Sequence, residues 1–243
     1  MQTVLILGGT SDIAYELAKI HIGEQDEVIL ASRNVDNLKV IQSDLKIRYR
    51  GGVMIEKFDA TDTATHKSFF EELPDSISLV YCLFGYLGDN DLAQTSWAEA
   101  QQIINSNYVG AVSILNIISE EFARKKEGVI VGVSSVAGVR GRQSNYIYGS
   151  AKAGFTAYLS GLRNRLYHDG VHVLTVLPGF MNTKMTAGMD LPKLLTASPE
   201  VAARKIAKAA KKKKNTAYVL GKWRYIMMVI SNIPESIFKK LKL

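Results

Sequence analysis

The sequence predicts a single α/β domain in which a doubly wound parallel sheet is flanked by helices on both faces. Short, continuous apolar runs alternate with segments of helical periodicity, which is the pattern of a parallel sheet buried on both sides. The first run ends in a glycine-rich turn that leads into a helix. A chain of 243 residues with 47% hydrophobic side chains is long enough for one large core.

Seven apolar runs are predicted to form the strands, because each is short, continuous and bounded by glycine, proline or polar residues. They cover residues 3–7, 27–31, 52–58, 78–84, 128–133, 171–177 and 216–220. Apolar residues at helical spacing predict helices between them, over residues 13–22, 35–49, 63–73, 97–125, 144–167 and 199–212. The long helix is expected to break near residues 105–107.

Cysteine and histidine usage argues against a disulfide framework and a metal site. The one cysteine, Cys82, lies inside a predicted strand and is interpreted as a buried structural thiol. This usage suits a reducing, cytoplasmic compartment. No cluster has zinc-ligand spacing, and the four histidines lie in different elements. No metal is therefore expected, and neither a signal peptide nor a membrane-spanning stretch is recognised.

The positive charge is concentrated at the end of the chain. The net charge is +7, but residues 204–243 hold twelve Lys or Arg and one acid, a net of +11, which leaves −4 for residues 1–203. Basicity confined to a tail argues against a nucleic-acid-binding domain.

One helix carries residues with acid–base potential. Tyr148 and Lys152 are four positions apart, so they share one face of the predicted helix. An ammonium beside a tyrosine favours the phenolate, and the pair is a candidate general acid/base. Ser135 follows the fifth predicted strand, at the carboxyl end where open parallel sheets bind ligands.

The first strand leads into a candidate phosphate cradle. The turn reads Gly8-Gly9-Thr10-Ser11-Asp12-Ile13, and its backbone N–H groups and the following helix N-terminus would face an anion. Asp12 is unusual in such a turn, because a carboxylate near pyrophosphate is unfavourable. It is interpreted as a helix cap or first-turn acid.

These motifs together resemble those of the short-chain dehydrogenase/reductase family over about residues 3–221. The resemblance implies a seven-stranded Rossmann-like fold and hydride transfer between a nicotinamide cofactor and a carbonyl or alcohol. Tyr148 would then donate the proton and Ser135 would hydrogen-bond the substrate oxygen. Lys152 would lower the tyrosine pKa and hold the nicotinamide ribose, and Asn107 would position a water relay leading back to it.

The resemblance also assigns cofactor contacts. Asp59 matches an acid that contacts adenine, and Gly85 is the one residue kept from the family's Asn-Asn-Ala-Gly motif. Pro178-Gly179 and Thr183 match a turn that contacts the carboxamide or phosphates. The full predicted cofactor set is Gly8, Thr10, Ser11, Asp12, Ile13, Ser32, Arg33, Asp59, Gly85, Tyr148, Lys152, Pro178, Gly179 and Thr183.

The end of the second strand predicts the choice of cofactor. NAD-binding proteins often carry an acid there, whereas this chain has Ser32 and Arg33. A hydroxyl and a guanidinium suit the additional 2′-phosphate, so NADPH is favoured over NADH. Residues 180–197 are expected to form a mobile substrate lid whose methionines and leucines favour an apolar substrate flank.

Residues 222–243 are interpreted as a basic amphipathic extension. Trp223, Ile226, Met227, Ile230 and Ile233 can share one helical stripe, which suits a membrane interface, an oligomer contact or a lid packed on the core. The glycine turn and this ending are similar to those of reductases of polyprenyl-phosphate-linked 2-keto-pentoses. A lipid-linked keto sugar reduced at the inner membrane surface is therefore one hypothesis.

Two other hypotheses remain for the function. One is a soluble reductase of keto or acyl carbonyl compounds, with the tail steering acidic partners. The other is a non-catalytic dinucleotide sensor on the same fold. Family analogy also predicts a homodimer or homotetramer.

Overall fold

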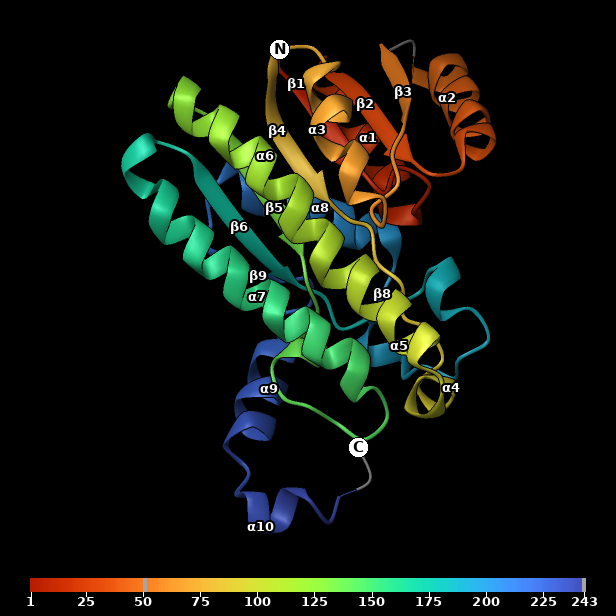
Figure 1. Cartoon of the computed structure of the whole chain (residues 1–243). Helices are drawn as coiled ribbons and strands as arrows, with labels where there is room; N and C mark the ends of the chain where they lie inside the picture. Colours follow the sequence, from red (N-terminus) through yellow and green to blue (C-terminus); the bar gives the residue numbers. More distant parts are fainter. Residues whose placement is uncertain (50–51, 242–243) are drawn as a thin grey trace.

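The computed structural model describes residues 1–49 and 52–241. Its main sheet is parallel throughout, with the order β3-β2-β1-β4-β5-β6-β9 (Figure 1), which confirms the predicted fold class. The chain builds outward from β1 to β3 and then returns to β4, so the topology switches between β1 and β4. The strands are β1 (Thr3–Leu7), β2 (Glu27–Ser32), β3 (Val53–Lys57), β4 (Ile77–Cys82), β5 (Val129–Val133), β6 (His172–Leu177) and β9 (Thr216–Tyr218).

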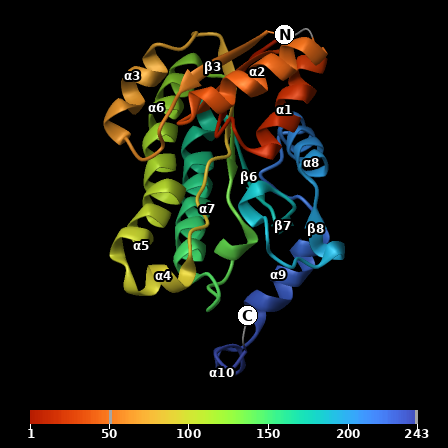
Figure 2. The same cartoon turned by 90° about the vertical axis from the view of Figure 1, so that its right-hand side faces the viewer.

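Helices cover both faces of this sheet, as Figure 2 shows from the side. One face carries α1 (Asp12–Gly23), α2 (Val35–Tyr49) and α8 (Pro199–Lys211). The other carries α3 (His66–Glu71), α6 (Gly110–Lys125) and α7 (Tyr146–Leu166). Alternation along the strands explains the two cores: Val4 of β1 belongs to the first and Leu5 to the second, and both are fully buried.

The long helix does not break where the sequence predicts. α5 (Trp97–Ile104) continues through a π-helical turn (Asn105–Val109) directly into α6. The wider turn absorbs one residue without ending the helix, and such turns are frequent at functional sites. Gly110 follows it because a Cβ there would overlap the carbonyl of Ala60.

Two short elements lie outside the sequence-based expectations. α4 (Asn90–Thr95) is capped by Asp89, whose carboxylate accepts from two backbone N–H groups of its first turn. The predicted lid is held at its base by a parallel pair of two-residue strands, β7 (Phe180–Met181) and β8 (Thr196–Ala197).

The C-terminal extension folds back onto the domain as α9 (Lys222–Asn232) and α10 (Glu235–Phe238). Trp223 and Met227 are buried and pack with Val136 and Leu177. Arg140 anchors the far end of α9, donating to the carbonyl oxygens of Ile230 and Ile233 at 2.7 and 2.6 Å. The apolar stripe predicted for this segment therefore faces the core. Among the described residues, no helix is long and apolar enough to cross a bilayer.

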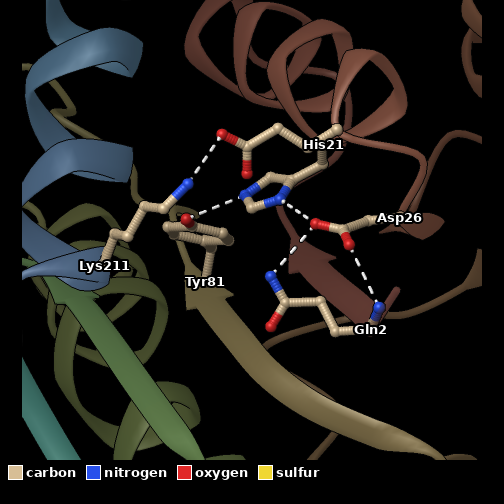
Figure 3. Close-up of polar contacts among 6 residues, drawn as sticks. Gln2, His21, Asp26, Tyr81 and Lys211 are labelled. Atoms are coloured by element: carbon tan, nitrogen blue, oxygen red, sulfur yellow. Dashed lines mark hydrogen bonds and ion pairs between the residues drawn. The ribbon is translucent and has the colours of Figure 1, made fainter.

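A buried polar network ties the amino-terminal end of the sheet to α1 (Figure 3). His21 contacts Asp26 Oδ2 through Nδ1 at 2.8 Å and the Tyr81 hydroxyl through Nε2 at 2.9 Å. Gln2 donates to the same carboxylate from its backbone and its side chain. Glu24 lies nearby and pairs with Lys211 at 3.3 Å. Both ring nitrogens have protein partners, so the group is a structural network rather than an open ligand set.

Asp26→Asn is expected to lower the free energy of unfolding by about 1.5–3 kcal/mol at pH 7, because charge-assisted hydrogen bonds are lost. Burial alone would raise the pKa of Asp26, but hydrogen bonds from His21 and Gln2 outweigh it and hold that pKa below its ordinary value. The carboxylate's stabilisation is therefore full above about pH 4 and is lost as the pH falls through the folded-state pKa.

Urea unfolding at pH 7 and pH 3 measures this difference, with Asp36→Asn as the control because the Asp36 side chain is 89% exposed. An Asp26→Asn deficit that stays the same at both pH values would contradict the assignment of the charge to this network.

Candidate active site

A cavity of about 930 Å³ opens at the carboxyl edge of the sheet, beside the switch point between β1 and β4. Its walls come from the glycine-rich turn, the ends of β2, β4, β5 and β6, the start of α7, the lid and α9. Crevices at such switch points are where open α/β sheets bind ligands. The structure brings most of the predicted site residues to this cavity: Gly8, Thr10, Ser11, Asp12, Ile13, Ser32, Arg33, Gly85, Ser135, Tyr148, Lys152, Pro178, Gly179 and Thr183.

Tyr148, Ser135 and Lys152 converge on one wall of the cavity. Ser135 begins the 3₁₀ turn Val136–Gly138, where its hydroxyl accepts from the Ala137 N–H at 3.1 Å. Lys152 is 3% exposed, and its Nζ donates to the carbonyl oxygen of Val133 at 3.2 Å. The same Nζ lies 5.8 Å from the centre of the Tyr148 ring. The structure thus brings these three residues to one cavity, and their catalytic roles stay predictions.

The protonation of the pair differs from the expectation. Burial raises the pKa of Tyr148 to about 12, and the hydrogen bond with Ser135 opposes this only in part. Burial lowers the pKa of Lys152 to about 8. Desolvation outweighs the predicted effect of the ammonium on the tyrosine. The phenol therefore keeps its proton at neutral pH, which is the state a proton donor needs.

Asn107 does not line the cavity but lies behind it, in the π-helical turn. Its Nδ2 donates to the carbonyl oxygens of Tyr86 and Ile103 at 2.6 and 2.8 Å, and its Oδ1 accepts from the Tyr86 N–H at 3.2 Å. A Cβ at Gly85 would lie 2.7 Å from that Oδ1. Asn107 therefore fixes the loop after β4, and its role in a water relay stays a prediction.

Asp12 is directed toward the lid. Ser11 is the N-cap of α1, and Asp12 is the first helical residue. The Asp12 carboxylate accepts from the Lys184 backbone N–H at 2.9 Å and lies 3.7 Å from the Lys184 ammonium. This cation offsets the negative charge that makes Asp12 unusual in a phosphate-binding turn.

The end of β2 also lines the cavity. Ser32 Oγ lies 3.2 Å from Thr10 Oγ1, and Arg33 is exposed at the cavity wall. Asp59 is half-buried outside the lining, and its carboxylate accepts from the N–H and hydroxyl of Thr61 at 2.9 and 2.7 Å. These bonds hold a local turn between Asp59 and Thr61, and the adenine contact of Asp59 stays a prediction.

Trp223, which belongs to the apolar stripe predicted for residues 222–243, also lines the cavity. Its indole packs against the Pro178-Gly179 turn so closely that a Cβ at Gly179 would overlap it. Nε1 donates to the carbonyl oxygen of Leu195 in the lid at 3.0 Å. Helical spacing predicted that this side chain lies on an apolar stripe and left open whether the stripe meets a membrane, another subunit or the core. Spacing within one helix carries no information about which surface it meets.

Comparisons with known proteins match this architecture. A family model described as short chain dehydrogenase matches residues 2–193. An uncharacterized oxidoreductase of Mycobacterium tuberculosis is 34% identical over 241 residues, which cover 98% of this chain and 96% of the relative. An NADP-dependent 3-hydroxy acid dehydrogenase of Schizosaccharomyces pombe is 25% identical over 76% of this chain and 73% of its own.

A solved structure supports the fold in three dimensions. A short-chain dehydrogenase from Sphingobium yanoikuyae in complex with NADPH superposes with a TM-score of 0.83 at 21% identity, covering 97% of this chain and 98% of that one. The sheet order, the helix that carries Tyr148 and Lys152, and these matches agree. The chain belongs to the short-chain dehydrogenase/reductase family and is an oxidoreductase of the carbonyl/alcohol type.

Proposed function

We propose that the protein reduces a carbonyl to an alcohol with NADPH, with Tyr148 as the proton donor. The observation that carries this proposal is the convergence of Tyr148, Ser135 and Lys152 on a cavity that also reaches Ser32 and Arg33. The nicotinamide cofactor supplies the hydride when bound. The protonated phenol of Tyr148 donates to the substrate oxygen, and the Ser135 hydroxyl stabilises the charge that develops there.

The glycine-rich turn fits a dinucleotide. Gly8 has a φ of +92°, and a Cβ there would lie 2.7 Å from the Phe84 nitrogen, so only glycine fits at this position of the turn. The N-terminus of α1 opens onto the same space and favours an anion such as pyrophosphate. We assign the cofactor to this turn, with Lys152 at the ribose and Pro178, Gly179 and Thr183 at the carboxamide end.

The predicted preference for NADPH depends on Arg33. It is exposed at the cavity wall, and a guanidinium there would pair with the 2′-phosphate that distinguishes NADPH from NADH. The Schizosaccharomyces relative is named NADP-dependent and the Sphingobium structure is named as an NADPH complex, which support the same choice.

Arg33→Gln is expected to weaken NADPH binding by about 10–100-fold, because charge-assisted hydrogen bonds contribute about 1.5–3 kcal/mol. NADH binding should change less than about twofold. Titration followed by nicotinamide fluorescence measures both affinities.

Lys39→Gln is the matched control, because Lys39 lies on α2 in an exposed pair with Asp36. Equal affinity of the wild type for the two cofactors would reject the NADPH assignment. Binding of neither would reject the enzyme proposal with it.

The finer proposals concern the substrate. Met185 and Met189 line the cavity and are 46% and 51% exposed, which favours a substrate with an apolar flank, as a lipid-linked keto sugar would have. A soluble keto or acyl carbonyl compound is the alternative. NADPH oxidation with a panel of both classes distinguishes them. Tight NADPH binding without oxidation by any carbonyl would instead favour the dinucleotide-sensing hypothesis.

A further inference from the structure

The part of the cavity beyond Tyr148 holds polar side chains that the proposed mechanism does not use. Asn90 is the first residue of α4, and Arg142 and Asn145 lie in the loop that leads into α7. α4 and the start of α7 lie far from α2 in both views (Figures 1 and 2), and Arg33 directly precedes α2 in the chain. These residues therefore face the place left for the substrate.

Each of the three side chains has a buried polar atom without a hydrogen-bond partner. In the described residues, the buried side-chain atoms without one are Asn90 Oδ1, Arg142 Nε and Asn145 Oδ1, and all three residues line this cavity. A buried polar atom left unpaired costs about 1–3 kcal/mol, so such atoms are rare and need an explanation. Their concentration at one end of one cavity is unlike a random packing defect.

The surrounding loop is held in place by other bonds. Asn90 Nδ2 donates to the carbonyl oxygen of Gln143 at 3.3 Å, which ties α4 to the loop. The backbone of Asn145 donates to the carbonyl oxygen of Arg142 at 3.1 Å and accepts from the Gly149 N–H at 2.7 Å. The unpaired atoms therefore belong to residues whose backbone or side chain is already held by other hydrogen bonds between α4, the loop and the start of α7.

Arg142 is the charged residue among the three. Among the described residues, no acidic side chain lies within ion-pair distance of its guanidinium. The nearby cavity acid, Asp89, caps α4 through Oδ1 and forms no ion pair with Arg142 in the described residues. Burial lowers the pKa of Arg142, yet an arginine keeps its charge at neutral pH. A partly desolvated, unpaired cation is unfavourable unless a ligand supplies the counter-charge.

We propose that Arg142, Asn90 and Asn145 form a substrate subsite that binds an oxyanion, a carboxylate or a phosphate, on the carbonyl substrate. The guanidinium pairs with the oxyanion, and the two side-chain amides hydrogen-bond to neighbouring polar groups of the substrate. The subsite holds the substrate by its charged end while the carbonyl lies at Tyr148. This inference rests on the proposed reductase function and specifies that the substrate carries a negative charge.

The test compares matched pairs of substrates. Acetoacetate is paired with its ethyl ester, and dihydroxyacetone phosphate with dihydroxyacetone. A polyprenyl-phosphate-linked keto sugar is a third arm that separates a lipid phosphate from a free one. The wild type should prefer the anionic member of at least one pair. Arg142→Gln should lower kcat/KM for that member by about 10–100-fold and leave the neutral member within about twofold.

Arg142→Lys should recover part of the loss, since the charge is kept and the bidentate geometry is not. Lys193→Gln is the control for general electrostatic steering, because Lys193 is exposed in the lid and outside the cavity lining. Unchanged NADPH affinity in each variant shows that the fold is intact. Equal rates on charged and neutral members in the wild type, or an equal loss on both in Arg142→Gln, would overturn the subsite alone.

Failure of the reductase function is distinguishable from failure of the subsite. If the NADPH-saturated wild type reduces nothing, calorimetric binding of inorganic phosphate decides the subsite separately. Binding by the wild type that is lost in Arg142→Gln would support it. Equal binding by the two proteins, or none by either, would overturn it.

Discussion

Tyr148→Phe is expected to lower kcat by about 10²–10⁴-fold, the usual contribution of a positioned proton donor. The change removes one oxygen and leaves the ring, which packs beside Ile103 and Ala100, in place. NADPH affinity and the melting temperature should stay close to those of the wild type. NADPH oxidation, measured with the best carbonyl from the substrate panel, reports the loss.

Tyr146→Phe is the matched control for this prediction. It makes the same chemical change two residues away on α7, at a side chain that is 45% exposed and outside the cavity. The control should keep full activity. If Tyr148→Phe kept more than about a third of the wild-type rate, the proton would have to come from another group, and the assignment of Tyr148 as general acid would be wrong.

The strands were predictable because a central parallel strand is buried on both faces and must be apolar along its length. The runs at residues 3–7, 128–133 and 171–177 differ from β1, β5 and β6 by at most one residue at an end. α4 was missed because it has only six residues and depends on the Asp89 cap rather than on an apolar stripe. The break expected at 105–107 is a π-helical turn, which has no distinct composition.

In the site, too, features set by local sequence were predictable and features set by distant contacts were not. Ser135, Tyr148 and Lys152 could be predicted to share one site, because the end of a strand and the spacing within a helix can both be recognised locally in the sequence. The partner of Asp12 is Lys184, 172 positions away, and no spacing rule connects them. The pKa direction of Tyr148 depends on burial by the assembled cavity, so the sequence indicated only the neighbouring ammonium. Arg142 is one arginine in an irregular loop and becomes informative only when its surroundings are known.

The largest effect on stability is expected for a substitution in the C-terminal extension. Trp223→Ala should lower the free energy of unfolding by about 3–5 kcal/mol, the range for removing a buried large aromatic side chain. Trp223 is 4% exposed and meets the Phe180 ring edge-on at 5.2 Å, in addition to its hydrogen bond to Leu195. Both partners belong to the predicted lid, so the same variant should also raise KM by loosening the cavity wall. Urea unfolding and steady-state kinetics measure the two effects.

Trp97→Ala separates this role from the loss of any tryptophan, because Trp97 is 68% exposed and should cost less than about 0.5 kcal/mol. Trp223→Phe keeps an aromatic ring but not the N–H, so its deficit should fall between the two alanine variants. If α9 did not pack on the domain, both alanine variants would lose equally little unfolding free energy and KM would not change. A large deficit confined to Trp223, together with a raised KM, would mean that α9 supports the lid and completes the wall of the active site.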